Sequence, residues 1–376
     1  MDFDFTEDQK HLQQEARRFL SANCGTARVR QVLDEPDTPF DAELWTAMAD
    51  LGWQGAILPE AYGGSGMGAT DLCAIAEELG RAVNPTPFAS SVYAFAEAVN
   101  LLGSEQQKSL ILPHIASGHQ IGCIATAEGA GRPDLECAFV DSSITGRKVP
   151  VTDGDVADWA IALANDSHGE SLYLIELKRH GVSTTTLPTL DPTRSCAEIK
   201  FTGASAAPLG EAGSGKALLQ KIHDRAAVFV AFEQLGGAEA ALATAQDYAQ
   251  QRYAFGRAIG SFQAVKHKLA RIYVANQIAR SNCYFGAWAL ESQSEELPRA
   301  AAAARIAATR AFQLAASEMI EIFGGIGTTW ETDCHLFYRR AKQLSLFLGP
   351  INIWKERLAA EIEKQWALAD SHGGNL

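Results

Sequence analysis

Apolar residues recur at the spacing of an α-helix over most of this chain and change to short β-type runs only in its middle. Apolar positions three to four residues apart are the signature of a helix with one buried face. This spacing predicts helices over residues 6–22, 41–51, 69–81, 87–102 and 105–116, and again over 216–250, 261–292, 297–323, 332–347 and 350–370. Between residue 121 and about residue 210, runs such as DWAIALA and LYLIEL alternate with Gly, Asp and Pro, as in strands joined by turns.

These patterns predict an α+β multidomain protein with three domains. Residues 1–117 form an N-terminal helical domain, residues 118–212 a small central β-barrel or sandwich, and residues 213–376 a C-terminal bundle of four or five helices. Helices, one small β domain and helices again make an uncommon order, so the order itself narrows the choice of folds.

The longest predicted helix lies in the stretch 224–263, where no Pro interrupts the apolar spacing. It ends in Arg252-Tyr-Ala-Phe255-Gly256, and Gln263 follows where the next apolar run begins. A guanidinium can pair a phosphate group through two hydrogen bonds, and an aromatic side chain can contact a ring. The end of this helix is therefore a candidate site for a ligand that contains both an anion and a ring.

Composition and charge exclude several classes of partner. Hydrophobic residues make up 47% of the chain and charged residues 20%, which is typical of an ordinary globular protein. A net charge of -13 and a pI of about 5.2 disfavour a nucleic acid or an anionic membrane as partner, because phosphate binding needs a basic surface. No uninterrupted apolar run approaches the roughly 20 residues of a membrane span.

The cysteines and the N-terminus point to the cytoplasm. The seven Cys form no CxxC pair and show no regular spacing, so we expect neither a metal site nor a disulfide framework. The N-terminal segment is acidic and amphipathic, with Thr6 and Asp8 as candidate capping residues, and does not have the pattern of a signal peptide.

Five segments carry a resemblance to a known family. They are LGWQGAILPEAYGGSGMG (51–68), TAEGAGR (126–132), GRKVPVT (146–152), RYAFGRAIGSFQ (252–263) and FGGIG (323–327). They resemble, in this order, a helix-to-loop segment and the motifs T-E-P-G-A-G-S, G-x-K-x-W-I-T, R-x-x-F-G-x-x-I-x-x-x-Q and G-G-x-G of the acyl-CoA dehydrogenase family of flavoproteins. Each motif is weak alone, but five in the right order over nearly the whole chain are specific.

The resemblance implies FAD held between subunits. Thr126 and Thr152 would hydrogen-bond the flavin from the β domain. The pyrophosphate and adenine side of a flavin lying mainly in another subunit would meet Arg252, Phe255, Gln263, Gly324 and Gly325. The chain has no G-x-G-x-x-G between a strand and a helix, so a Rossmann-type dinucleotide site is not expected.

The chain departs from the family where the catalytic base is expected. In the family's reaction a carboxylate removes the α-proton of a CoA thioester while the β-hydrogen leaves as hydride to flavin N5. Most members take this Glu from a Y-E-G-T segment, and the matching position is Leu348; a minority take it from the long helix, just before an Arg, and those positions are Ala226 and Ala227. Neither residue type can accept a proton.

Other departures also fall on the substrate side. Arg132 stands where the family's loop has a substrate-facing Ser, and Pro150 where a Trp covers the flavin. Asp224 keeps a position in the family's CoA-side segment. Asp224 and Arg132 are therefore the candidate substrate-binding residues.

Glu233 is the one candidate base that remains. It lies seven residues beyond Ala226, two turns along the same helix face, inside the apolar stretch VFVAFEQLGG. Burial would raise the pKa of its carboxyl, as a base requires. The alternative is a buried Glu that bonds to a neighbouring helix, because two turns place it about 10 Å from the usual base position.

Three functions stay open at this stage. The first is a working FAD-dependent acyl-CoA dehydrogenase that oxidises a CoA thioester. The second is a catalytically silent subunit that completes a partner's flavin site, as in the α2β2 complexes for steroid side-chain thioesters. Their C-terminal pattern G-x-T-W-E-x-D-x-H-L-x-x-x-R-A resembles residues 327–341. The third is other flavin chemistry, which no residue favours. The predicted partner is a paralogous dehydrogenase subunit or, in a homotetramer, further copies of this chain; the sequence fixes neither the acyl group nor the electron acceptor.

Overall fold

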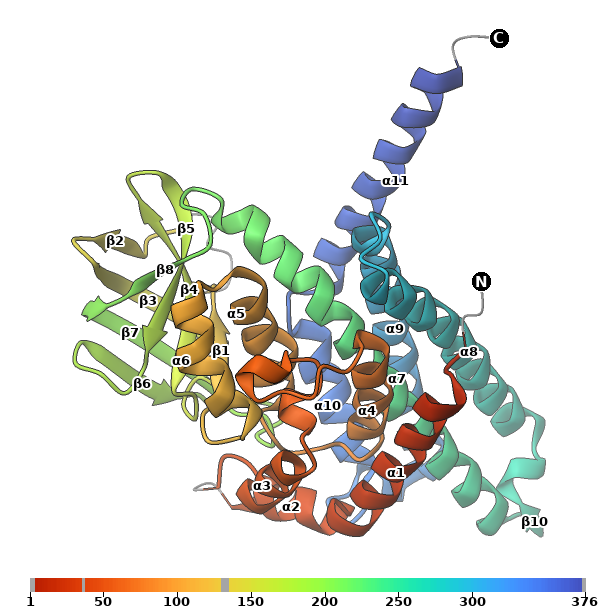
Figure 1. The fold of residues 1–376 in the computed structure, drawn as a ribbon. Coiled ribbons are helices and arrows are strands. Elements are labelled where there is room, and N and C mark those ends of the chain that lie inside the picture. Colours follow the sequence, from red (N-terminus) through yellow and green to blue (C-terminus); the bar gives the residue numbers. More distant parts are fainter. Residues whose placement is uncertain (1–3, 36–37, 130–134, 374–376) are drawn as a thin grey trace. The chain divides into compact units, whose positions relative to one another are not determined.

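The computed structural model describes residues 4–35, 38–129 and 135–373, with side chains described up to residue 367 (Figure 1). Its helices fall where the apolar spacing predicts them. They are α1 (Glu7–Asn23), α3 (Ala42–Asp50), α4 (Ala69–Arg81), α6 (Glu105–Ala116), α7 (Gly215–Gln251), α8 (Gln263–Glu291), α9 (Leu297–Phe323), α10 (Cys334–Leu346) and α11 (Ile351–Gly373).

Two helical segments differ from the prediction. Helix α2 (Thr26–Asp34) was not expected, because its nine residues bury only Val29 and Val32 and so show too little of a repeating pattern. The segment predicted as one helix over 87–102 consists of a π-helix, η3 (Ala89–Ala96), followed by α5 (Glu97–Leu102). Every residue of η3 is buried, so its composition carries no amphipathic signal that could show the change of pitch.

The described chain divides into two compact units. The first comprises residues 1–26, 69–84 and 227–376, and the second residues 27–68 and 85–226, so helix α7 contributes to both. The fold class expected from the sequence, with N-terminal helices, a central β region and a C-terminal helical bundle, is confirmed. The two domain boundaries, at 117/118 and 212/213, stay predictions.

The second unit contains an eight-stranded sheet with the strand order β6-β7-β3-β2-β4-β5-β8, and β1 pairs with β4. Its strands are β1 (Gly122–Ala125), β2 (Ala138–Val140), β3 (Ser143–Thr152), β4 (Trp159–Asp166), β5 (Gly169–Glu176), β6 (Val182–Thr186), β7 (Cys196–Ser205) and β8 (Ala207–Leu209). The run FVDSSITGRKVPV (139–151) forms a hairpin: Asp141 and Ser142 adopt left-handed φ values of 49° and 62° at the turn between β2 and β3.

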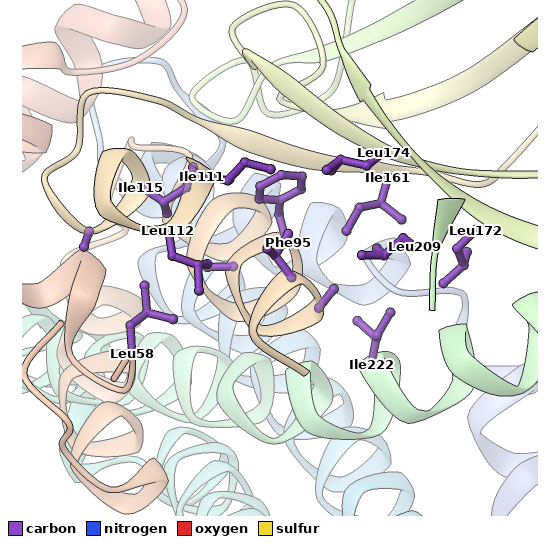
Figure 2. Close-up of a cluster of buried hydrophobic side chains, with 14 of the residues drawn as sticks. Leu58, Phe95, Ile111, Leu112, Ile115, Ile161, Leu172, Leu174, Leu209 and Ile222 are labelled. Atoms are coloured by element: carbon purple, nitrogen blue, oxygen red, sulfur yellow. The ribbon is translucent and has the colours of Figure 1, made fainter. Parts of the chain in front are cut away.

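One hydrophobic core joins this sheet to the helices of the same unit (Figure 2). The sheet contributes Ile161 and Leu174, helix α6 contributes Ile111 and Leu112, and the first part of α7 contributes Ile222. All of these side chains are almost completely buried, so the core fixes the strands that precede the candidate site.

The first unit is a helical bundle whose closest crossing is made by two glycines. A Cβ atom on Gly80 of α4 would lie 1.7 Å from the carbonyl oxygen of Glu233, and one on Gly236 of α7 would lie 1.7 Å from that of Glu77. Helices α4 and α7 therefore meet backbone to backbone, and Glu233 lies at the crossing.

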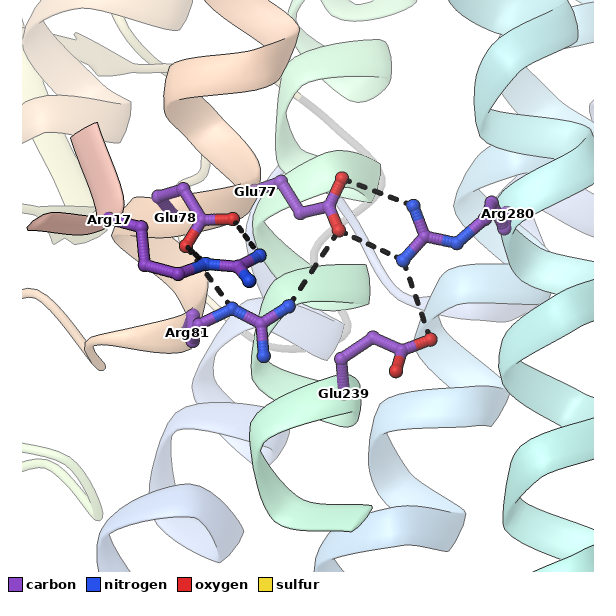
Figure 3. A network of polar contacts seen from close by, with 6 residues as sticks. All are labelled: Arg17, Glu77, Glu78, Arg81, Glu239 and Arg280. Atoms are coloured by element: carbon purple, nitrogen blue, oxygen red, sulfur yellow. Dashed lines mark hydrogen bonds and ion pairs between the residues drawn. The ribbon is translucent and has the colours of Figure 1, made fainter. Parts of the chain in front are cut away.

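Charged side chains surround this crossing in an alternating network (Figure 3). Arg17 of α1 binds Glu78 of α4 through two hydrogen bonds of 2.8 and 2.9 Å. Arg280 of α8 binds Glu77, with 2.9 Å between Nη2 and Oε1, and lies 3.4 Å from Glu239 of α7. The buried carboxylates of α4 are thus paired with cations from α1 and α8.

Helix α7 carries the most extended apolar sequence of the described helices. By length and composition it is the one that could cross a membrane, but 83% of its most apolar window is buried within the fold. This is the behaviour of a core helix, and the feature is weak evidence for a membrane span. All seven cysteines lie among the described residues, and none forms a disulfide.

Candidate functional site

The C-terminal end of α7 turns sharply into a small hairpin. The backbone N–H of Arg252 bonds the Tyr248 carbonyl at 2.8 Å, and strand β9 (Tyr253–Ala254) then pairs with β10 (Arg257–Ala258). Phe255 and Gly256 form the turn with φ values of 53° and 80°. A left-handed φ is unfavourable for a bulky residue such as Phe, and backbone of this kind is concentrated at functional sites.

The side chains of this hairpin point into solvent. Phe255 is 95% exposed, and its ring meets the half-buried ring of Phe262 edge-on at 6.2 Å. The Arg257 guanidinium stacks on the ring of Phe262, 4.0 Å from its centroid. Arg252 and Gln263 are exposed too, and within the described residues the Arg252 side chain makes no hydrogen bond or ion pair. A strained, solvent-facing Phe beside a free guanidinium is suited to contact a ligand or a partner.

Two open glycines lie at the same end of the bundle. Helix α9 ends at Phe323, whose ring stacks on Tyr248 with 3.9 Å between the centroids, and the short helix η5 (Gly324–Thr328) follows. A Cβ atom on Gly324 or Gly325 would meet no atom within 4 Å. The backbone here can be approached closely by a phosphate group, so the predicted residues Arg252, Gly324 and Gly325 are brought to one end of the first unit.

Thr126 and Thr152 both lie on the sheet of the second unit. Thr126 follows β1 and Thr152 ends β3; both are half-buried, and within the described residues neither hydroxyl makes a hydrogen bond. The Val149 N–H donates to the Ala127 carbonyl at 2.8 Å, so the segment after β1 runs alongside β3. The two hydroxyls are therefore available to a ligand from one sheet.

The turn after Thr152 is fixed by buried side chains. Asp153 adopts a φ of 55° and is almost completely buried, and its carboxylate accepts a hydrogen bond of 2.5 Å from Ser90 of η3. Its own N–H donates to the Ser195 carbonyl at 2.9 Å. These contacts hold the end of β3 in one position.

Leu348 lies on a turn that a buried arginine holds from behind. Leu348 is half-buried with a φ of 61°, and Gly349 follows with a φ of 96°. Arg305 of α9 donates from Nη2 to the carbonyls of Leu344 and, at 2.7 Å, of Phe347, at the end of α10. Arg305 also bonds Gln234, and burial lowers the pKa of its guanidinium to about 9. Hydrogen bonds from Arg305 thus hold the backbone next to this turn, although the side chain of Leu348 is apolar.

Glu233 is completely buried and faces a cation. Its Oε1 lies 3.8 Å from Nη1 of Arg340 on α10, which is completely buried as well. Arg340 donates in turn to the Asn84 carbonyl at 2.9 Å. The contacts of Glu233 therefore correspond to the alternative raised from the sequence, a buried Glu bonded to a neighbouring helix.

Matches to known domains and to a related protein show the family of this chain. Residues 6–119 match the acyl-CoA dehydrogenase N-terminal domain and residues 213–363 the acyl-CoA dehydrogenase C-terminal domain. Acyl-CoA dehydrogenase IpdE2 of Mycobacterium tuberculosis is 30% identical over 357 residues, which span 95% of this chain and 98% of that protein. The chain belongs to the acyl-CoA dehydrogenase family.

Solved acyl-CoA dehydrogenases share the whole fold. A chain of the ChsE4–ChsE5 complex from Mycobacterium tuberculosis is 27% identical with a TM-score of 0.87, over 96% of this chain and 99% of that one. A chain from a variant of the Tcur3481–Tcur3483 steroid ACAD is 28% identical with a TM-score of 0.87, over the same shares. Members of the acyl-CoA dehydrogenase family are FAD-binding flavoproteins, and FAD is the cofactor of this family.

The exposed end of the first unit has a composition that fits FAD. The Arg252 guanidinium, which has no partner within the described residues, and the open backbone of Gly324 and Gly325 suit a pyrophosphate. The exposed ring of Phe255 and the amide of Gln263 suit an adenine. The hydroxyls of Thr126 and Thr152 can act as donor or acceptor to the polar edge of a flavin.

The second base position of acyl-CoA dehydrogenases is closed. Ala226 and Ala227 are completely buried, and Asp224 is almost completely buried one turn earlier. The nearest cation, Arg225, lies about 200° around the helix from position 227 and forms an ion pair with the buried Glu97. Arg225 thus cannot replace the missing Arg. Arg132 lies outside the described residues.

Two buried charged features were not expected from the sequence: Arg305, and the ion pair between Glu128 and Lys148. Arg305 is one of the two arginines in the Ala-rich stretch AAAARIAATRAF and directly follows four Ala, and a charge inside an apolar part of a helix was the available signal. Lys148 occupies the Lys of the G-x-K motif, but nothing in that motif names its partner.

Proposed function

We propose that this chain is one subunit of an FAD-dependent acyl-CoA dehydrogenase assembled from two unlike chains, α2β2, and that its partner supplies the catalytic base. The observation that carries this proposal is Leu348. It stands at the family's base position on a turn whose backbone Arg305 holds in place, and its side chain cannot accept a proton. The other family position is occupied by the buried Ala226 and Ala227.

The chain's own contribution is the cofactor-binding surface. When bound, FAD supplies the acceptor for the hydride that leaves the acyl group. Arg252, Gly324 and Gly325 would bind its pyrophosphate, while Phe255 and Gln263 would contact the adenine side. Thr126 and Thr152 would hydrogen-bond the flavin edge. None of these roles needs a proton acceptor, so they remain useful in a subunit without a base.

The relatives favour a mixed assembly and a bulky substrate. The ChsE4–ChsE5 structure is a complex of two differently named chains, and the Tcur3481–Tcur3483 protein is named a steroid ACAD. For this chain we propose a partner of the same family, a CoA thioester with a bulky acyl group, and a cytoplasmic location. Asp224 and Arg132 are its proposed substrate-side contacts.

A second candidate is a dehydrogenase that works without a partner and uses Glu233 as base. Glu233 favours it because it is a completely buried carboxylate on the same helix face as the closed base position. The geometry weighs against it, since Glu233 is held beside Arg340. A general base must reach the α-carbon of its substrate, whereas the Glu233 carboxylate is packed against the equally buried Arg340.

The test is to purify this chain alone and together with a dehydrogenase-like protein encoded beside it. We expect the pair, and not the single chain, to retain FAD and to dehydrogenate an acyl-CoA. In the pair, replacing the partner's base carboxylate by its amide should abolish turnover, and Glu233→Gln in this chain should leave turnover measurable. Turnover by the chain alone that disappears in Glu233→Gln with FAD still bound would establish the second candidate instead.

A further inference from the structure

A buried ion pair lies directly behind the two threonines proposed to contact the flavin. Lys148 of β3 is completely buried, and its Nζ lies 2.5 Å from Oε1 of Glu128 and 3.5 Å from the Thr126 carbonyl oxygen. A lysine is rarely buried completely unless it is paired, because leaving water costs its ammonium group a large hydration energy.

The carboxylate of Glu128 connects three segments of the sheet. Besides Lys148, it accepts the backbone N–H of Glu136 at 2.6 Å and of Cys137 at 3.1 Å. Asn165 of β4 holds the same region, since its side chain donates to the Leu135 carbonyl at 2.7 Å. Glu128 and Lys148, named here the Glu128–Lys148 clasp, therefore bind the segment after β1 to β3 and to the start of β2.

Strand β3 and the segment just before β2 approach each other closely beside the Glu128–Lys148 clasp. A Cβ atom on Gly146, two residues before Lys148, would lie 2.7 Å from Cα of Cys137 and 2.8 Å from its sulfur. The Gly of the G-x-K motif thus permits the close approach across which the clasp forms. The carboxylate at position 128 replaces the Pro of the resembled T-E-P-G-A-G-S pattern, so that motif does not provide this clasp.

We infer that Glu128 and Lys148 are positioning residues for the flavin: they fix the spacing between Thr126 and Thr152. Thr126 accepts directly from Lys148 through its carbonyl, and Thr152 ends the same strand four residues after Lys148. A flavin edge that binds both hydroxyls needs them at a constant separation, and two hydrogen bonds to one rigid ring tolerate little drift. This inference rests on the proposed role of the two threonines.

The test compares Glu128→Gln, Lys148→Met and the double variant, each as the full-length chain assembled with the unlike subunit of the proposed pair, with FAD as the probe. Three quantities are measured: the dissociation constant for FAD, the absorbance spectrum of the bound flavin, and the urea midpoint without FAD. Arg147→Met is the matched control, because Arg147 is the preceding residue of β3 but is 46% exposed and pairs with Glu198.

Each single variant leaves one buried group without its charged partner, so we expect a lower urea midpoint and FAD binding weakened about tenfold or more. The double variant has no unpaired buried charge, so its midpoint should return toward that of the wild type. Its FAD binding should stay weakened and its flavin spectrum shifted, which a purely structural role would not produce.

Wild-type FAD affinity and spectrum in the double variant would overturn the inference. This result leaves the mixed-subunit proposal intact, because that proposal is tested by turnover. Conversely, turnover by the chain alone would remove the mixed-subunit proposal and leave the clasp standing.

Discussion

Glu233 and Arg340 face each other with both side chains completely buried and 3.8 Å between Oε1 and Nη1. The pair joins α7 to α10, and Arg340 extends the connection to Asn84 at the end of the α4 segment. The completely buried carboxylate of Glu233 is therefore engaged in holding helices together, which is why we propose that a partner subunit supplies the base.

Glu233→Gln should destabilise the chain strongly. It removes the negative charge that faces the buried Arg340 cation, and the expected loss in the free energy of unfolding is about 3–5 kcal/mol. The double variant Glu233→Gln/Arg340→Met removes both charges and should regain part of the loss. Urea unfolding followed by circular dichroism measures both values. Glu321→Gln is the control, since Glu321 is the exposed partner of Lys268 and its replacement should change little. Wild-type stability in Glu233→Gln would mean that the pair contributes nothing.

The glycine crossing predicts opposite outcomes for two Gly→Ala substitutions. Gly236→Ala puts a methyl group 1.7 Å from the Glu77 carbonyl oxygen, so α4 and α7 must move apart at a cost of about 3 kcal/mol or more. Gly325→Ala meets no atom within 4 Å and should leave stability unchanged while weakening FAD binding. Thermal unfolding and FAD titration separate the two effects. Equal stability of the two variants would show that the helices do not cross this closely.

The arginines of the hairpin should differ in their importance for FAD. Arg252→Ala removes the guanidinium proposed to pair the pyrophosphate, and FAD affinity should fall about 10- to 100-fold without loss of stability. Arg257→Ala is the matched control, because Arg257 lies in the same hairpin and stacks on Phe262. Calorimetric titration of the assembled protein with FAD measures both. Equal effects of the two substitutions would contradict the assignment of Arg252.

The helices could be predicted because their apolar spacing is long and regular, and the candidate cap Thr6 does cap α1 by accepting the Gln9 N–H at 3.3 Å. Short elements could not. Helix α2 buries only Val29 and Val32, and strand β8 (Ala207–Leu209) has only three residues, so neither shows a clear period; Pro208 further weakens the strand signal.

Motif order predicts the candidate cofactor residues, because R-x-x-F-G and G-G-x-G have fixed residue types. Contacts between distant segments have no such signal. The partners of Glu233 and Lys148 lie 107 and 20 residues away in the sequence, and periodicity relates only residues on the same helix or strand. The buried pairs therefore became visible only in the fold.

Stability should depend on Glu128 in a pH-dependent way. Burial acts to raise the pKa of its carboxyl, but the bonds from Lys148 and from two backbone N–H groups outweigh burial and lower the pKa below the ordinary 4.5. A carboxyl with a lowered pKa in the folded state stabilises the protein above its unfolded-state pKa, and this contribution is lost as the pH falls through the folded-state pKa. The difference in unfolding free energy between wild type and Glu128→Gln should thus be constant from about pH 7 to about pH 5 and shrink below 4.5. Urea unfolding at several pH values checks this, and a difference that stays constant down to about pH 3 would contradict it.

The most direct test of the missing base is the acyl-CoA-dependent reduction of FAD by this chain in isolation, followed by the loss of flavin absorbance under anaerobic conditions. The wild-type chain supplied with FAD and a CoA thioester should leave the flavin oxidised, and addition of the paralogous subunit should bleach it. Bleaching by the chain alone would show that it carries its own base. It would contradict the proposal that the chain cannot remove the α-proton because Leu348 stands at the base position.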